Sequence, residues 1–410
     1  MTKYNTFTLD NGLRIIHLPS NSKVVFCGIA VKAGTRDEQA SEEGLAHFCE
    51  HLSFKGTERR SAVQIINAIE GLGGELNAFT NKEDTVYYCA IQTKHFMKAA
   101  DVLVDIVFHS TYPQQEVEKE REVVCDEIES YEDSPAELIF DDIENILFEG
   151  HPLGHNILGT VNRVRAYNSD DAKRFVSRYY RPDNCVFFVN GDIDFNSLVR
   201  WLKKNCKTVS SQSALTPRTH FPPVVQQNAA IVRRQRGTHQ AHIVMGTLGY
   251  AVDDKKRWAL YLLNNILGGP GLNSLLNMTL RERHGLVYSV DSSIVSYGDT
   301  GLVCIYFGCD SNDVKVCIRL VRRVLDKLMN TTLNERQMKK AKQQLQGQLS
   351  IASDNREQFT LDFARTFLHQ DKERNLNDII EHIEGVTADE LKEVACELFA
   401  DNRITTLVYE

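Results

Sequence analysis

A short segment of the chain carries residue types that together can bind a metal ion and move a proton. Residues Gly44–Phe54 contain the pattern H-x-x-E-H, formed by His47, Glu50 and His51. On a helix, residues four apart project from one face about one turn from each other, which suits two imidazole ligands of one zinc ion. Glu50 lies beside them and can take a proton from a zinc-bound water whose pKa the metal lowers. The pattern predicts hydrolytic zinc chemistry, and the alternative is a solvated helix face with two histidines.

A catalytic zinc usually has three protein ligands, so a further ligand must come from another segment. The acidic segment 116–131 is the candidate, because its apolar residues recur at helical spacing. They are Val117, Val124, Ile128 and Tyr131. Glu120 and Glu127 lie on or beside this stripe, and carboxylates that face a core need a cation or hydrogen-bond donors. The alternative is that both lie at the edge of an acidic, solvated helix.

The elements that must position these residues are a mixture of strands and helices. The pattern predicts strands at 6–18, 24–32, 75–80 and 85–92, and helices at 43–54, 61–71, 95–109, 114–131 and 135–148. Antiparallel hairpins among runs of helices indicate an α+β fold and not a doubly wound parallel sheet.

An internal similarity predicts two related domains. Residues 169–190 and 387–408 match at a constant offset of 218, the second strand running on to Tyr409, and each segment is typical of a capped helix, an Asp-Asn turn and a closing strand. Chance similarity of one such unit is the alternative. Residues 210–225 lack periodicity and hold three of the nine prolines, as linkers do. We expect a first α+β domain at 1–209, a linker at 210–225 and a second α+β domain at 226–410.

The composition narrows the class of protein. A chain of 410 residues with 42% apolar content can give each of two domains a core. Its 47 basic and 55 acidic residues, with a net charge of -8, disfavour nucleic acid and anionic lipid as partners. The first ten residues lack a signal-peptide pattern and no apolar run is long enough to span a membrane. Ten scattered cysteines indicate reduced, mostly buried thiols, so we expect a soluble, cytoplasmic protein.

Further segments accompany the H-x-x-E-H pattern and the acidic pair. They are Gly44–His51, Phe54–Thr57, Leu76–Thr80, Gly150–Gly154, Gly159–Thr160, Asn190–Asp192, Leu267–Gly269 and Leu280–Ser289. With 75 residues between His51 and Glu127, the set resembles the inverzincin metallopeptidases of the pitrilysin, insulin-degrading enzyme and mitochondrial processing peptidase family. The resemblance covers essentially all 410 residues. The length is similar to that of the short branch, whose members are half-clamshells that pair.

The resemblance implies roles for residues of the first half. His47, His51 and Glu127 would be the ligands of one zinc ion per chain, and Glu50 would be the general base. Glu120 would be an auxiliary acidic residue that orients a histidine ligand.

Substrate contacts follow from the same resemblance. Asn77 and Ala78 lie on an edge strand that would pair with an extended peptide, while neighbouring pockets would bind its side chains. Phe54 would line such a pocket, and packing in the core is its alternative role.

The second half is expected to bind substrate and no metal. The offset of 218 takes His47 and Glu50 to Asn265 and Gly268, which cannot repeat the pattern. Arg281 and Tyr288 resemble an arginine–tyrosine pair that reaches the substrate and helps to hold the oxyanion.

These expectations describe a zinc endopeptidase that encloses short or unfolded peptides, with Glu50 activating a zinc-bound water. One chain holds both sets of residues, so a homodimer is the simplest assembly, and a hetero-partner subunit is the alternative. The alternative function is a non-catalytic structural or chaperone-like subunit of the same family.

Overall fold

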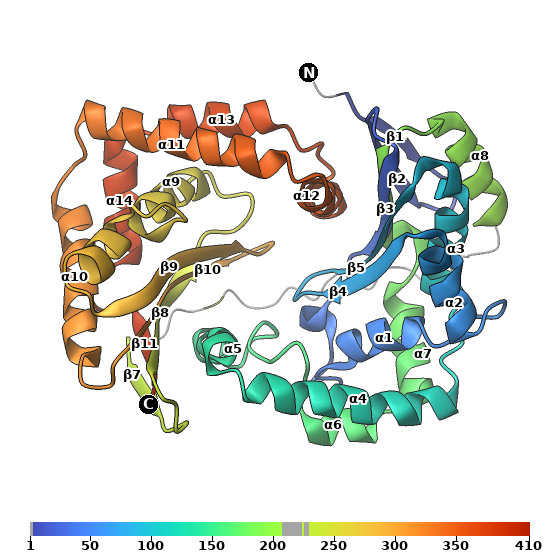
Figure 1. The fold of residues 1–410 in the computed structure, drawn as a ribbon, viewed down its shortest axis with the longest axis horizontal. Coiled ribbons are helices and arrows are strands. Elements are labelled where there is room, and N and C mark those ends of the chain that lie inside the picture. The colour runs from blue at the N-terminus through green and yellow to red at the C-terminus, as the bar shows by residue number, and fades with distance from the viewer. Residues whose placement is uncertain (1–2, 207–223, 225–228) are drawn as a thin grey trace. The chain divides into compact units, whose positions relative to one another are not determined.

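The chain folds into two units, each built from one β-sheet and several helices (Figure 1). The computed structural model describes residues 3–206, 224 and 229–410. The first unit comprises Met1–Glu129, His155–His220 and Ala352–Asn375, and the second comprises Ser130–Gly154, Phe221–Ile351 and Leu376–Glu410.

The sheet of the first unit has six strands in the order β1-β2-β6-β3-β5-β4. The strands are β1 (Asn5–Thr8), β2 (Arg14–Pro19), β3 (Val24–Val31), β4 (Glu75–Thr80), β5 (Thr85–Gln92) and β6 (Cys185–Gly191). β2 and β6 are parallel, and the other neighbours are antiparallel. Strand β4, which carries Asn77 and Ala78, therefore lies at an edge.

The sheet of the second unit has five strands in the order β7-β11-β8-β10-β9. They are β7 (Ile231–Arg234), β8 (Ala241–Gly249), β9 (Val287–Ser296), β10 (Gly301–Cys309) and β11 (Thr405–Tyr409). β7 and β11 are parallel, and the other neighbours are antiparallel. This sequence of pairings repeats that of β2-β6-β3-β5-β4 in the first unit. The predicted α+β class with two similar sheet-and-helix halves is confirmed.

The matching segments at the 218-residue offset occupy equivalent places. Helix α7 (Ser169–Tyr179) leads into β6, and helix α14 (Ala388–Leu398) leads into β11. Asn168 caps α7 and Thr387 caps α14 by accepting hydrogen bonds from main-chain N–H groups of the first turn. Both closing strands lie inside their sheets, next to the one parallel neighbour.

Five further α-helices, α1 to α5, correspond to predicted helices, and the bounds of the remaining α-helices of the described chain were not predicted. In the first half they are α1 (Leu45–Ser53), α2 (Ala62–Ile69), α3 (Phe96–Phe108), α4 (Gln114–Glu132), α5 (Pro135–Leu147), α6 (Val161–Ala166) and α8 (Phe195–Asn205). In the second half they are α9 (Arg257–Gly268), α10 (Val314–Asn330), α11 (Glu335–Ser353), α12 (Arg356–Gln370) and α13 (Leu376–Gly385).

The central strands of each sheet are buried on both faces. In β6, Phe187 belongs to the main core of the first unit, whereas its neighbour Phe188 packs in a second cluster with Phe363 of α12. Helix α5 covers the second sheet in the same way, where Ile143 and Leu407 share a cluster. Strands buried on two faces are continuously apolar, because residues of both faces need apolar neighbours.

Helices α5 and α12 therefore exchange units. α5 precedes residue 209 but packs in the second unit, and α12 follows residue 226 but packs in the first. The expected domains 1–209 and 226–410 therefore differ from the two packed units at α5 and α12. The predicted linker at 210–225, apart from Val224, lies outside the described residues, so that boundary stays a prediction.

One predicted strand was wrong. Residues 6–18 form two antiparallel strands, β1 and β2, and not one. The turn between them needs Gly12, whose φ is 90° and whose Cβ, if present, would lie 2.7 Å from Asp183. All ten cysteines are free thiols and nine are buried. None of the described helices is both long and apolar enough to cross a membrane.

Candidate active site

Helix α1 carries the H-x-x-E-H pattern and begins at a crowded glycine. Gly44 has a φ of 87°, and a Cβ there would lie 2.5 Å from the carbonyl oxygen of Leu158. Gly44 has no side chain to cap the helix, and Glu38 accepts the hydrogen bonds instead, from the N–H groups of Gly44 (3.0 Å) and Ala46 (2.7 Å). The close packing of Gly44 and the carboxylate of Glu38 therefore set the position at which α1 starts.

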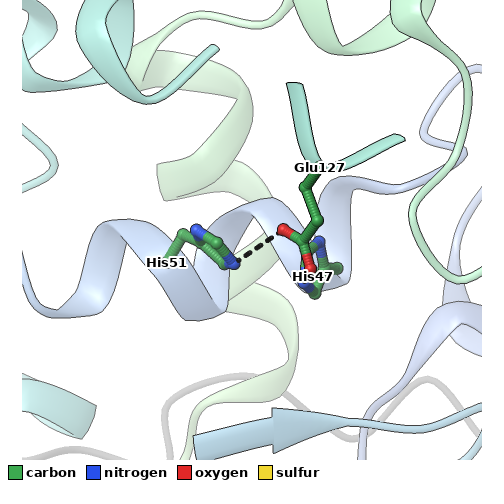
Figure 2. A group of neighbouring side chains, drawn as sticks. All are labelled: His47, His51 and Glu127. Carbon is green, nitrogen blue, oxygen red and sulfur yellow. Dashed lines mark ion pairs between the residues drawn. The ribbon is translucent and has the colours of Figure 1, made fainter. Parts of the chain in front are cut away.

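Three side chains meet on the face of α1 that α4 approaches (Figure 2). Nε2 of His51 lies 3.4 Å from Oε2 of Glu127, and Nε2 of His47 lies 3.9 Å from Oε1 of the same carboxylate. One possible ligand atom from each residue lies within 4.8 Å of the other two. His47 is buried, His51 is half-buried and Glu127 is exposed, so the group is open on one side.

The donor set fits a zinc ion, because two imidazole nitrogens and one carboxylate oxygen are ligands that zinc takes in catalytic sites. Burial and the neighbouring His51 lower the pKa of His47 to about 3, so its imidazole is neutral and has a lone pair to donate. Burial also disfavours the charged form of His51, but the hydrogen bond to Glu120 and the nearby carboxylates outweigh it and raise the His51 pKa. Among the described residues, this is the one group of three or more His, Cys, Asp or Glu residues with such spacing.

Glu120 lies on α4 behind His51. Its Oε1 is 3.0 Å from Nδ1 of His51, and its Oε2 is 2.8 Å from Nζ of Lys55. Burial alone would raise the pKa of Glu120, but the hydrogen bonds from His51 and Lys55 lower it below its ordinary value. The carboxylate is thus ionised, and it accepts a hydrogen bond from the imidazole ring of His51.

Glu50 is buried beside the two histidines and contacts strand β4. The hydroxyl of Thr80 donates a hydrogen bond of 2.5 Å to its Oε2. Burial raises the pKa of Glu50 to about 7, although the bond from Thr80 and the charge of His51 oppose this shift. A carboxyl group whose pKa lies near neutrality is well suited to exchange protons.

The residues predicted to bind substrate lie on or near β4. Asn77 is exposed and Ala78 is half-buried. The N–H of Ala78 donates to Oδ1 of Asn77 (2.9 Å), so it is not used in pairing with β5. Phe54 packs against the main core, with its ring centroid 6.0 Å from that of Tyr87, so both alternatives for this residue stay open.

Arg281 and Tyr288 belong to the second unit and lie close together there. The guanidinium carbon of Arg281 is 5.6 Å from the ring centroid of Tyr288, which is a cation–π distance. Tyr288 is 81% exposed, the largest exposed fraction among the large apolar and aromatic side chains of the described chain. An exposed tyrosine at the start of edge strand β9 is free to contact a ligand.

Three residues that support the site were not predicted. Glu38 caps α1, Thr80 holds Glu50, and Lys55 holds Glu120. Thr80 and Lys55 both lie in segments that carry the family resemblance, but the resemblance assigned no role to either residue. Glu38 is separated from α1 by a loop, and no sequence pattern signals its contact.

Comparison with protein families gives two matches that together span most of the chain. Residues 15–161 match the model described as "Insulinase (Peptidase family M16)", and residues 166–345 match "Peptidase M16 inactive domain". The chain is 32% identical over 408 residues to "Uncharacterized zinc protease YmxG" of Bacillus subtilis, which covers 98% of this chain and 97% of the relative. It is 34% identical over 397 residues to an "Uncharacterized zinc protease" of Streptomyces coelicolor, covering 95% and 85%.

Solved structures share the fold at lower sequence identity. "A protease from Helicobacter pylori" superposes with a TM-score of 0.92 at 23% identity and covers 100% of both chains. A "putative M16-like peptidase from Alicyclobacillus acidocaldarius" has a TM-score of 0.85 at 18% identity and covers 100% of this chain and 98% of the other.

Proposed function

The chain belongs to the M16, or insulinase, family of peptidases, and from this premise we propose that it is a zinc-dependent endopeptidase acting on short or unfolded peptides. The observation that carries the proposal is the group of His47, His51 and Glu127 with Glu50 on the same helix face. Two relatives named as zinc proteases support the choice of metal.

The metal would be held by Nε2 of His47, Nε2 of His51 and the carboxylate of Glu127. When bound, zinc lowers the pKa of a coordinated water to about 7 and polarises the carbonyl of the peptide bond. Glu50 would act as the general base. Thr80 occupies its Oε2, so Oε1 is the atom that would accept a proton and later return it to the leaving amine.

The peptide would bind as an added strand at β4. An edge strand offers main-chain N–H and C=O groups to an extended chain, and such pairing tolerates many side chains. Asn77 would have to turn away so that the N–H of Ala78 can donate to the peptide. Phe54 would contact a peptide side chain from the α1 side.

The second unit would supply Arg281 and Tyr288 as donors to the developing oxyanion, because a guanidinium and a phenol hydroxyl both donate hydrogen bonds. The match of residues 166–345 to a domain named inactive agrees with an expected single zinc per chain. We include in the proposal a homodimer with one site in each chain, located in the cytoplasm.

The test uses the purified chain with its metal content measured. The wild type should contain one zinc per chain and cleave a library of unstructured peptides, and a chelator should abolish cleavage until zinc is restored. Glu50→Gln should keep zinc and lose on the order of 100- to 10,000-fold in kcat. A Glu50→Gln protein with wild-type kcat would contradict the role of Glu50.

Metal analysis also separates the alternative function. A chain that dimerises fully but binds no zinc would favour a structural or chaperone-like subunit over an enzyme.

A further inference from the structure

Lys55 lies directly after helix α1 and contacts the acidic helix α4. Its Nζ is 2.8 Å from Oε2 of Glu120, whose other oxygen is 3.0 Å from Nδ1 of His51. The side chains are 30% exposed in Lys55, 6% in Glu120 and 23% in His51. The three side chains thus form a continuous chain of contacts from the surface to the candidate metal centre, and each oxygen of Glu120 has its own partner.

The main chain on both sides of Lys55 is fixed. Its N–H donates to the carbonyl of Leu52 (3.0 Å), which closes the last turn of α1. Gly56 follows with a φ of 145°, and its carbonyl accepts a bond from the N–H of Thr111 (3.0 Å). The side chain of Lys55 therefore starts from a fixed point and reaches Glu120 without any rearrangement of the loop.

Glu120 depends on both of its partners. A carboxylate removed from water costs several kcal/mol unless an opposite charge and hydrogen-bond donors compensate for lost hydration. Lys55 supplies the charge and His51 supplies one donor. Loss of the lysine would leave Oε2 unpaired, and the carboxylate would have to turn toward water.

We infer that Lys55 is a positioning residue for the metal centre, which orients Glu120 so that His51 keeps its proton on Nδ1 and presents Nε2 to the metal. An ionised carboxylate only accepts hydrogen bonds, so the contact with Glu120 requires a proton on Nδ1. Nε2, 3.4 Å from Glu127, then carries the lone pair. The inference rests on the metal group of the proposed function.

His47 is the other histidine of the group, and no carboxylate of the described residues orients its ring through Nδ1. Nδ1 of His47 is buried and makes no hydrogen bond within the described part of the chain. The orientation of His47 is therefore set by packing, whereas the orientation of His51 is set by the contacts of Glu120. Lys55 therefore acts on the site through Glu120 and His51, and not through His47.

A purely structural role for Lys55 would be a tie between α1 and α4. Such a tie would change the free energy of unfolding but would not alter zinc affinity or the tautomer of His51 in the folded protein. These two quantities therefore separate a positioning residue from a structural one.

The experiment titrates metal-free protein with zinc against a chelating indicator. Lys55→Met keeps the apolar stem and removes the charge, and we expect zinc affinity to fall by roughly 10- to 100-fold, as for other residues that orient a metal ligand. Lys55→Arg should restore affinity to near the wild-type value. Lys119→Met is the matched control, because Lys119 lies on α4, pairs with Glu116 at 2.6 Å, is 69% exposed and should have no effect.

A second measurement does not use zinc. Nitrogen NMR of the histidine rings in metal-free protein, at a pH where the His51 ring is neutral, should show His51 protonated on Nδ1 in the wild type and mixed tautomers in Lys55→Met. If Lys55→Met does not fold, Lys55→Gln takes its place in both measurements. A folded variant with wild-type zinc affinity and the wild-type tautomer would overturn the inference, whereas a wild-type protein that binds no zinc would overturn the proposed function instead.

Discussion

The hydroxyl of Thr80 donates a hydrogen bond of 2.5 Å to Glu50, and this bond joins edge strand β4 to the helix that carries the H-x-x-E-H pattern. The hydroxyl oxygen of Thr85 lies 3.4 Å from that of Thr80, and Thr85 itself donates to the carbonyl of Ala33 (2.9 Å). The carboxylate oxygen of Glu50 accepts and lies closer to the Thr80 hydroxyl than Thr85 does, at 2.5 Å against 3.4 Å, so the single hydroxyl proton of Thr80 is directed to Glu50. The strand that would hold the peptide also orients the proposed base.

Replacement of Thr80 tests this orientation. Thr80→Val keeps the shape and removes the donor, and we expect kcat to fall on the order of 10- to 100-fold, because a hydrogen bond to a charged group contributes about 1.5–3 kcal/mol. Zinc content should not change. Thr80→Ser retains a hydroxyl and should keep most of the activity, so equal losses in both variants would argue against the hydrogen bond as the cause.

Binding of the peptide at β4 is tested at Ala78. Ala78→Pro removes an N–H that β5 does not use, and proline is tolerated on edge strands where the N–H points outward. We expect KM to rise roughly 3- to 10-fold, as for one lost hydrogen bond, with kcat and zinc content nearly unchanged. Ala78→Ser keeps the N–H and is the control. An unchanged KM in a folded Ala78→Pro protein would place the peptide elsewhere.

The proposed role of Arg281 and Tyr288 is tested by variants that should lower kcat without lowering stability. Tyr288 is 81% exposed, so Tyr288→Phe should leave the melting temperature unchanged. If its hydroxyl donates to the oxyanion, kcat should fall by about 100- to 1,000-fold, as when other oxyanion donors are removed. Arg281→Met should also lower kcat, while the exposed neighbour Arg283→Met serves as control. Wild-type kcat in both Tyr288→Phe and Arg281→Met would remove this pair from the mechanism.

Acid stability of the first unit should depend on Asp84, which links the β4–β5 turn to α12. Its buried carboxylate accepts hydrogen bonds from Asn81 (2.8 Å), Arg365 (3.1 Å) and His369 (2.8 Å). Burial alone would raise the Asp84 pKa, but the bond from His369 and the charge of Arg365 outweigh it and lower the pKa to about 2.

The folded-state pKa of Asp84 lies below its unfolded value of 3.8, so its contribution to stability is full above that pH and is lost as the pH falls toward 2. The contribution is about 2 kcal/mol. Unfolding by denaturant between pH 7 and pH 2 should show a smaller loss of stability with acid in Asp84→Asn than in the wild type. The control is Asp362→Asn on α12. The ion pair of Asp362 with Arg374 is half-exposed and contributes about 1 kcal/mol or less to stability. Identical pH profiles of wild type and Asp84→Asn would contradict this account.

Much of the site could be predicted from the sequence because its geometry is local. His47, Glu50 and His51 share a face of α1 through the period of the helix alone, and the acidic pair on α4 follows from the same rule. The α+β class and the repeated helix–strand unit also rest on local periodicity and turn residues. These features require no knowledge of which elements touch.

The contacts between elements were decided only in three dimensions. Helical periodicity left open which glutamate of α4 would face the histidine nitrogens, because that depends on the rotation of α4 against α1, and only the family resemblance assigned Glu127 to the metal. Glu127 reaches Nε2 of both histidines, and Glu120 reaches Nδ1 of His51. The contacts of Thr80 with Glu50 and of Lys55 with Glu120 likewise depend on how separate elements pack together.

The exchange of α5 and α12 between the two units is the clearest case. Both helices present an apolar face, and the hydrophobic effect that buries such a face is non-directional, so it does not specify which sheet is covered. Helical pattern therefore predicts that each helix packs on a sheet. Only the folded chain, with its complementary clusters around Ile143 and Phe363, determines that each one covers the sheet of the other half.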